Sequence, residues 1–224
     1  MRALILLLCV LTLILSLDLL PKKEDMDGKT VEDTPTVNTT LPTVETVYVE
    51  LSPEEQAAVL RAEGILSQIT HENMSPMEVA FSIYRWCGSN IQYVGRSVKT
   101  HWATAAMDAF DSGTGDCYSY FSVAKALLTA AGIDNLDIQK EGGTSRHYWN
   151  LINLGSGWYH IDCTPRRIPG QFFMNTDAEL ETYSQANNHS HTFDSKAYPP
   201  RATTSVQHLV DYEGGQILGE GLCD

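Results

Sequence analysis

A cysteine, a histidine and an aspartate stand in this chain in an order that fits thiol chemistry. Cys117 lies in the run Gly-Asp-Cys-Tyr-Ser-Tyr, His147 opens the run His-Tyr-Trp, and Asp162 closes the run Trp-Tyr-His-Ile-Asp. In such a set the thiolate attacks a carbonyl carbon, the imidazole moves the proton and the carboxylate orients the imidazole. Three residues can fall in this order by chance, so the elements that hold them decide the interpretation.

The cysteine is expected in the first turn of a helix. Asp116 is a good N-cap residue, apolar residues follow it at helical spacing, and Gly132 is a normal stop signal. The N–H groups and the positive dipole end of a helix favour a thiolate at this position. We therefore expect a reactive Cys117 with a pKa below the usual value of about 8.5. The alternative is a buried structural cysteine, the commonest fate of an unpaired thiol.

The histidine and the aspartate are expected on one β-hairpin. Two segments rich in aromatic and branched residues flank a glycine-rich turn, as two paired strands would. A two-residue turn at Gly155–Ser156 pairs Trp149 with Asp162. His147 is then a diagonal neighbour of Asp162 on the same face of the sheet. His160 lies on this face too and is a rival base, although an ordinary strand residue is the simpler interpretation for it.

These motifs resemble those of the transglutaminase-like superfamily, in particular its bacterial, often secreted, single-domain members. The resemblance implies an α+β fold with a papain-like core, in which the nucleophile helix packs on an antiparallel sheet. It implies Cys117 as nucleophile, His147 rather than His160 as base, and Asp162 as the orienting acid. The resemblance runs from about Pro76 to about Pro199 and rests on Trp102 with Ala105-Ala106, the runs at 115–120, 131–133, 147–149 and 157–158, Asp162-Cys163-Thr164-Pro165, and the segments 172–177, 191–194 and 198–199.

An acyl-transfer enzyme of this kind also needs donors for the oxyanion that forms during attack. The backbone N–H of Cys117 is one candidate. A second donor is expected from Gln92 or Tyr93, on an extended segment before the nucleophile, and Trp102 is expected to form a wall of the cleft.

The function that follows is a cysteine enzyme acting on amide bonds of peptides or proteins through a thioester, with cell-wall peptide as one candidate substrate. Hydrolysis is favoured over cross-linking, and no cofactor is implied. The alternative is an extracellular binding or scaffold module that has kept the fold without catalysis. An intact Cys-His-Asp set counts against this alternative, because a binding module does not need all three residues.

Composition limits the partners. Charged residues make up 19% of the 224 residues, hydrophobic ones make up 43%, and the net charge is −13. These fractions are ordinary for one globular domain. The negative charge argues against nucleic acid or an anionic membrane surface as an electrostatic partner.

The chain divides into three parts. Residues 1–20 are expected to be a signal peptide or an uncleaved N-terminal anchor, because an apolar run from Ala3 to Leu17 follows Arg2. Residues 21–50 form a Thr-, Pro- and acid-rich linker with too little apolar surface to order itself, although 44–51 could add an edge strand. Residues 51–224 form the catalytic domain. We expect a secreted or extracytoplasmic protein, attached to the membrane only through its N-terminal segment if that segment is uncleaved.

Two capped helices open the domain. Ser52-Pro53-Glu54-Glu55 and Ser75-Pro76-Met77-Glu78 are capping boxes with proline at the first helical position. The helices are expected to run to about Ile69 and about Cys87. A shorter third helix is expected near 104–110.

Five cysteines remain to be placed. Cys9 falls in the N-terminal apolar run and Cys117 is the candidate nucleophile. One disulfide among Cys87, Cys163 and Cys223 and a set of free buried thiols are equally compatible with the sequence. No spacing typical of a zinc site occurs, and a metal site at His189 and His191 is a weak alternative. We therefore expect no metal and no cofactor.

Overall fold

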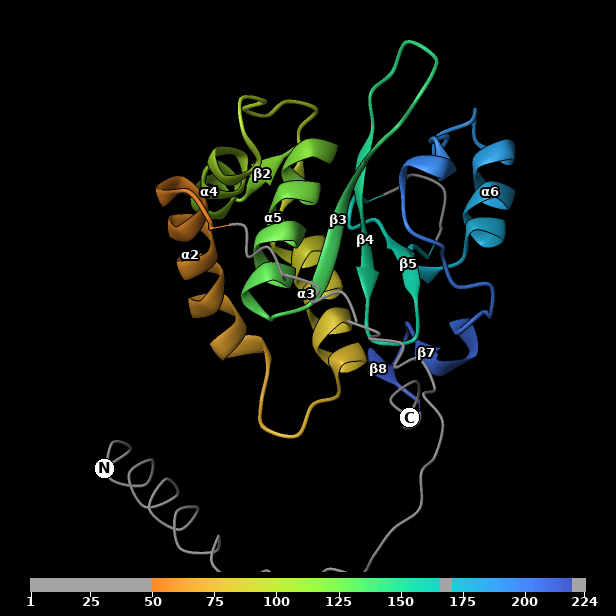
Figure 1. Cartoon of the computed structure of the whole chain (residues 1–224). Coiled ribbons are helices and arrows are strands. Elements are labelled where there is room, and N and C mark those ends of the chain that lie inside the picture. The colour runs from red at the N-terminus through yellow and green to blue at the C-terminus, as the bar shows by residue number, and fades with distance from the viewer. Residues whose placement is uncertain (1–49, 166–170, 219–224) are drawn as a thin grey trace, which may run out of the picture. The chain divides into compact units, whose positions relative to one another are not determined.

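The computed structural model describes residues 50–165 and 171–218 of the chain (Figure 1). The expected signal or anchor at 1–20, nearly all of the expected linker at 21–50, and Cys9 and Cys223 lie outside the described residues. Within the described part, none of the helices combines the length and the apolar character that crossing a bilayer would need.

Two helices begin as their capping boxes predict. Helix α2 spans Pro53–Ile69 and helix α3 spans Pro76–Asn90. In each, a serine hydroxyl accepts from the third helical N–H and the glutamate there accepts from the serine N–H. The expected end of the first helix at about Ile69 is confirmed, and the second runs three residues past Cys87.

The third helix is longer than its apolar pattern predicts. Helix α4 spans Trp102–Ser112, whereas 104–110 was expected. Its N-cap is His101, whose Nδ1 accepts from the N–H of Ala103 at 3.3 Å. Histidine is not among the preferred capping residues, so the sequence does not indicate that the helix begins at Trp102. The helix ends at Gly113, which has a φ of +63°.

The candidate nucleophile helix is α5, Cys117–Ala130, with Asp116 as N-cap. A short parallel ladder leads into it, because strand β1 (Gln92–Tyr93) pairs with strand β2 (Thr114–Gly115). Most of the side chains of α5 are buried, since the helix contacts the other helices on one side and the main sheet on the other.

The main sheet has four antiparallel strands in the order β3-β4-β5-β6. Asn153 pairs with Trp158 and Asn150 with Ile161, so the register expected for the hairpin is confirmed. The strands are β3 (Asp134–Gln139), β4 (Tyr148–Asn153), β5 (Trp158–Ile161) and β6 (Phe173–Asn175).

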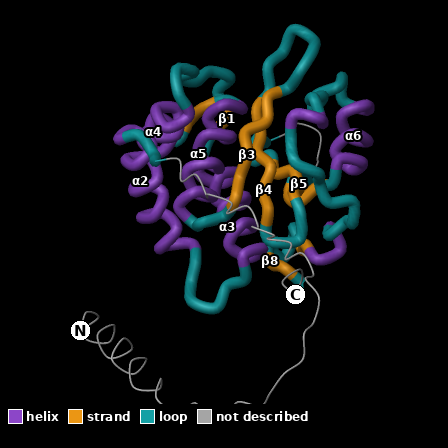
Figure 2. Tube along the Cα trace, in the orientation of Figure 1, coloured by secondary structure: helices purple, strands orange, loops and turns teal. Residues whose placement is uncertain are grey.

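The two faces of this sheet are covered differently. Helices α2 to α5 gather on one face, and helix α6 (Asp177–Ala186) lies on the other (Figures 1 and 2). Successive side chains of β4 point to opposite faces of the sheet. Ile152 belongs to the large core under the helices. Trp149 and Leu151 belong to a smaller core with Phe172 and Leu180 on the α6 side. This arrangement confirms the predicted α+β core with a helix packed on an antiparallel sheet.

Short elements complete the described chain. Turns of 3-10 helix occur at η1 (Ser195–Ala197) and η2 (Gln207–Leu209), and strands β7 (Val210–Asp211) and β8 (Gln216–Ile217) form a separate two-stranded sheet. The connection between β3 and β4 projects past the end of the sheet (Figure 1). It carries residues 140–147 and ends at the candidate base.

Candidate active site

Cys117 is placed by close packing just before its helix. A Cβ on Gly115 would lie 2.2 Å from the Cβ of Ser119, so only glycine fits at this position. The N–H of Val94 donates to the carbonyl oxygen of Gly115 at 2.8 Å, which fixes the chain entering the helix. The Sγ of Cys117 lies 3.9 Å from the carbonyl oxygen of Arg146, the second residue before strand β4.

The N-cap Asp116 is itself held by a loop. It accepts from the Oγ of Ser97 at 2.7 Å and from the N–H of Tyr118 at 2.9 Å, and the Nζ of Lys99 forms an ion pair with it. Burial raises the pKa of the Asp116 carboxyl, but these donors outweigh burial and leave the pKa lowered. A charged Asp116 therefore sits beside the candidate nucleophile.

His147 and Asp162 meet as the hairpin register predicts. The Nε2–H of His147 donates to Oδ2 of Asp162 at 2.8 Å, and both side chains are buried. The carboxylate only accepts, so this bond assigns the proton to Nε2 of His147. The N–H of Thr164 donates to the other oxygen, Oδ1, at 2.9 Å.

A second histidine shares this carboxylate. The Nε2 of His191 lies 3.0 Å from the same Oδ2 of Asp162, and its Nδ1 lies 2.9 Å from the Oγ of Ser190. The ring of His191 is buried against Phe172 and Tyr183. The sequence did not predict this contact, because nothing in the local pattern around His191 shows that it folds back onto Asp162.

Cys117 and His147 line one cavity of about 250 Å³. Asp162 lies behind His147 and is 2% exposed. The other residues lining the cavity are mostly polar or basic: Tyr93, Lys140, Ser145, Arg146, Thr164, Pro165, Asn187, Asn188 and Ser190. A larger cavity of about 680 Å³ beside it shares Lys140, Ser145 and Asn188 and also holds His189.

The surroundings of Cys117 favour the thiol, contrary to the expectation of a lowered pKa. Burial raises the pKa of Cys117 to about 11, and the carboxylates of Asp116 and Asp162 act in the same direction. The backbone N–H of Tyr148 and the ammonium of Lys99 oppose this shift without cancelling it. The helix N-terminus alone therefore does not produce a thiolate, and a base must take the proton.

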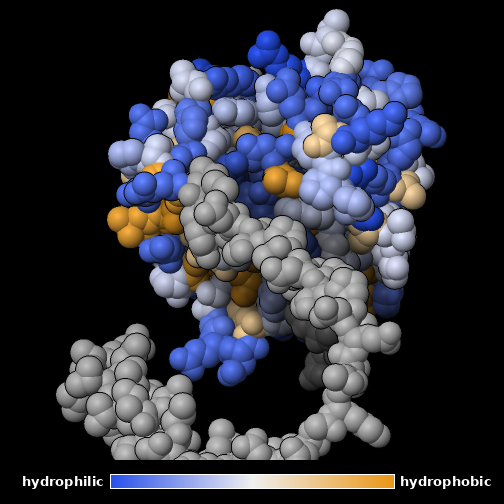
Figure 3. Space-filling model, viewed as in Figure 1, coloured by the Kyte–Doolittle hydropathy of each residue, from blue (hydrophilic) through white to orange (hydrophobic). Residues whose placement is uncertain are grey.

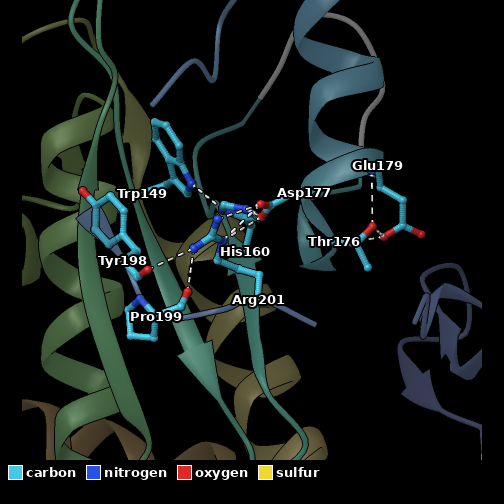
Figure 4. Close-up of polar contacts among 8 residues, drawn as sticks. All are labelled: Trp149, His160, Thr176, Asp177, Glu179, Tyr198, Pro199 and Arg201. Carbon is cyan, nitrogen blue, oxygen red and sulfur yellow. Dashed lines mark hydrogen bonds and ion pairs between the residues drawn. The ribbon is translucent and has the colours of Figure 1, made fainter. Parts of the chain in front are cut away.

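Trp149 lies between His147 and a second histidine network, and Figure 4 shows the part of that network formed by Trp149, His160, Asp177 and Arg201. Its indole stacks on His147, with ring centroids 5.6 Å apart, and its Nε1–H donates to Nδ1 of His160 at 3.0 Å. The Nε2 of His160 lies 2.8 Å from Oδ1 of Asp177, whose carboxylate also accepts from Arg201. His160 therefore faces Asp177 and does not line the Cys117 cavity.

The three other candidates lie in different places. Tyr93 lines the cavity and stacks on Tyr120, whereas Gln92 is not among the lining residues. Trp102 is buried at the start of α4, where its Nε1–H donates to Oε1 of Glu55 at 2.9 Å. It does not line the cavity at Cys117.

The structure also locates the two other described cysteines and the side chains that could bind a metal. Cys87 and Cys163 are free and buried, and the proximity of the Cys87 thiol, together with burial, raises the pKa of Cys163. Among the described residues, one group of side chains has the proximity of metal ligands: His147, Asp162 and His191, with ligand atoms within 4.8 Å of one another. The hydrogen bonds of the two imidazoles to Asp162 explain this proximity without a metal.

The chain is similar to two solved structures and to one protein family. Two solved structures are similar, a proposed cysteine protease from Cytophaga hutchinsonii at 16% identity and a structure described as a TGase at 10% identity, each with a TM-score of 0.41. They cover 51% and 62% of this chain, which spans 43% and 39% of theirs. No curated protein matches. Residues 63–163 match the transglutaminase-like superfamily, and they include Cys117, His147 and Asp162. Residues 63–163 are therefore assigned to the transglutaminase-like superfamily.

Proposed function

We propose that the protein is a cysteine enzyme that cleaves amide bonds of peptides or proteins through a thioester on Cys117. The observation that carries the proposal is the shared cavity of Cys117 and His147, with Asp162 bound to the far side of the imidazole at 2.8 Å. A buried carboxylate that orients a histidine beside a thiol is the arrangement that nucleophilic catalysis needs.

The first half of the reaction forms the thioester. Because Nε2 of His147 is engaged by Asp162, Nδ1 accepts the proton of the Cys117 thiol. The sulfur then bonds to the carbonyl carbon of the substrate, and the carbonyl electrons move to oxygen. As the oxyanion collapses, the C–N bond breaks and the leaving amine takes the proton from His147.

The second half restores the enzyme. A water molecule gives a proton to Nδ1 of His147 while its oxygen attacks the thioester carbon. The C–S bond breaks, a carboxylic acid leaves, and the proton returns to Cys117. The backbone N–H of Cys117 is the first oxyanion donor in this proposal, and Tyr93 is the neighbouring candidate for a second because it lines the same cavity.

Hydrolysis is the proposed outcome rather than amine transfer. Lys140 and Arg146 line the cavity, and both are cations that oppose the approach of a protonated amine. Serine, threonine and asparagine side chains on the same wall can hydrogen-bond water.

We also propose that the domain works outside the cytoplasm, because an apolar run of signal length precedes it. Cell-wall peptide is then one candidate substrate. Protease treatment of intact cells that carry the full chain should degrade the domain if it is exposed, and full protection of the domain would contradict export.

The catalytic proposal is tested with a peptide mixture and the full chain. New amino termini, detected by mass spectrometry, should appear with the wild type and with Cys87→Ala, but not with Cys117→Ala. In ¹⁸O-labelled water the new carboxyl groups should carry the label. A fluorescent primary amine added to the same mixture should be incorporated only as a minor product.

Two outcomes would contradict it. New termini that persist in Cys117→Ala would show that this thiol does not react. Binding of peptides without any cleavage, in wild type and Cys117→Ala alike, would favour the non-catalytic binding module instead.

A further inference from the structure

The wall of the Cys117 cavity carries a buried cation, Lys140. Its side chain is only 8% exposed, and its Nζ donates to one side-chain acceptor, the Oγ of Ser145 at 3.1 Å. An ammonium group has three donors and is costly to remove from water without acceptors or a counter-charge. In the described parts of the chain, no carboxylate lies within ion-pair distance of Lys140.

The position of Lys140 is tied to that of His147. The N–H of Lys140 donates to the carbonyl oxygen of His147 at 2.8 Å, one step beyond the paired residues Gln139 and Tyr148. Residues directly opposite each other in an antiparallel pair project their side chains from the same face. The ammonium therefore lies on the cavity wall beside the proposed base.

Two further groups on this wall are able to bind an anion. The Oγ1 of Thr164 is buried and has no hydrogen-bond partner among the residues that the structure describes. Arg146 lines the same cavity and is exposed. Thr164 supplies a hydroxyl donor and Arg146 a guanidinium, and both donors are suited to carboxylate oxygens.

The charge of this cavity is opposite to that of the protein. The chain carries a net charge of −13, yet among the described residues lining the cavity none is Asp or Glu, while Lys140 and Arg146 are bases. Glu141 lines the larger neighbouring cavity and not the cavity at Cys117. A volume of about 250 Å³ holds about eight waters, enough for a short acidic side chain next to the reacting amide.

We propose that Lys140, Thr164 and Arg146 form a carboxylate-binding subsite, and that the substrate amide carries a carboxylate close to the bond that is cleaved. This inference rests on the proposed function for the reaction at Cys117. It adds the class of substrate, an acidic peptide, and assigns Lys140 as the residue that selects it. The surface around the β3–β4 connection is hydrophilic in this view, which suits a polar peptide (Figure 3).

The test compares two alkylating agents of similar size on the full chain. Iodoacetate carries a carboxylate and iodoacetamide is neutral, so the ratio of their rates at Cys117 reports the local charge. Lys140→Met should lower this ratio about tenfold, because a cation in a partly desolvated cavity attracts an anion far more strongly than in water. The rate at which iodoacetamide alkylates Cys117 in Lys140→Met should stay within about twofold of the wild-type rate, since a neutral reagent is not attracted by the ammonium.

The matched control is Lys125→Met. Lys125 pairs with Asp137 on the exposed side of α5 and does not line the cavity. Its removal should leave the ratio unchanged, and Lys140→Arg should preserve most of it. A ratio that is the same in Lys140→Met and in the wild type would overturn the proposal.

A second measurement needs no variant and covers the case in which Lys140→Met does not fold. N-acetylglutamate should protect wild-type Cys117 from iodoacetamide, and N-acetylglutamine should not. Equal protection by both compounds, or protection by neither, would also overturn the subsite. Neither measurement needs turnover, so a failed subsite and a failed catalytic proposal give different results.

Discussion

The indole of Trp149 lies stacked on the imidazole of His147, with the two ring planes 20° apart. Trp149 is completely buried, and its N–H is anchored on His160. The proposed base is therefore held on one side by a carboxylate and on its face by an aromatic ring that cannot turn without breaking a hydrogen bond.

We expect Trp149→Phe to weaken both the fold and the site. The smaller ring leaves a cavity and removes the donor to Nδ1 of His160, and together these losses should cost about 2 kcal/mol of unfolding free energy. Turnover should fall as well, because His147 loses its packing partner. Urea unfolding and peptide cleavage measure the two effects. Leu180→Val is the control for the packing loss alone, because Leu180 lies in the same small core but on α6, outside the strands that carry His147 and His160.

The two histidines of the hairpin should differ in their effect on rate. His147→Ala should reduce turnover by several orders of magnitude, and Asp162→Asn should leave residual activity, because the carboxylate orients the imidazole and does not react. His160→Gln should be milder, since His160 faces Asp177 instead of the cavity. A greater loss in His160→Gln than in His147→Ala would show that the base has been misassigned.

His191 is expected to position Asp162 rather than to react. His191→Phe should lower kcat about tenfold with little change in KM, because one hydrogen bond to a charged acceptor is worth about 1.5 kcal/mol. His191→Gln keeps a side-chain N–H donor and should recover part of the loss. An effect on KM alone would contradict this role.

The pKa of Cys117, raised to about 11, makes its reactivity depend on His147. In His147→Ala, alkylation by iodoacetamide should be slow at pH 7 and should still be rising above pH 9, because only the thiolate reacts and no base takes the proton. The wild type should react faster at neutral pH. Mass mapping of the labelled protein gives the rates.

The same labelling separates Cys117 from the other thiols. Cys87 and Cys163 should stay unlabelled in the folded chain, because Cys87 is 0% and Cys163 is 6% exposed. Equal labelling of Cys117 and these two residues at pH 7 would contradict the idea of one reactive cysteine.

Acid should destabilise the fold through Asp177. Burial raises its pKa, but the hydrogen bonds from His160 and Arg201 outweigh burial and lower the pKa to about 2. A carboxyl whose pKa is lower in the folded state stabilises the fold above its unfolded value, near 3.8, and this stabilisation is lost as the pH falls towards 2. Urea midpoints from pH 5 to pH 2 should therefore fall more steeply for the wild type than for Asp177→Asn. Parallel curves would show that the Asp177 contacts do not stabilise the fold.

Much of the fold could be predicted from the sequence, because helix-capping residues, turn residues and apolar spacing indicated the same elements. Ser52 and Ser75 begin helices as their capping boxes predict, and Asp116 caps the helix of Cys117. The turn at Gly155–Ser156 set the register that joins His147 to Asp162. These features depend on residues close together in the chain, which is where sequence patterns are most informative.

Other elements were missed for identifiable reasons. Strand β3 is Asp-Asn-Leu-Asp-Ile-Gln, too polar to suggest a strand until it is paired with β4. The start of helix α6 was not predicted, although Thr176 and Glu179 form a capping box that marks it in the sequence. The contacts of His191 and Lys140 join segments far apart in the chain, and no local pattern encodes them.

The raised pKa of Cys117 shows the limit of arguing from one local effect. The helix N-terminus favours the thiolate, as expected. Burial and the carboxylates of Asp116 and Asp162 favour the thiol, and they prevail. Asp162 approaches Cys117 only through the folded hairpin, so its contribution could not be weighed from the helix alone.

The β3–β4 connection gives this domain a simple route for diversification. Residues 141–146 leave and rejoin the sheet at one hydrogen-bonded pair, Lys140 and His147. Insertions into such a loop cost little free energy, since closure entropy grows slowly with length. A lineage could therefore change residues 141–146, including the cavity-lining Ser145 and Arg146, while inheriting the strand that carries the proposed base and the paired Lys140 unchanged.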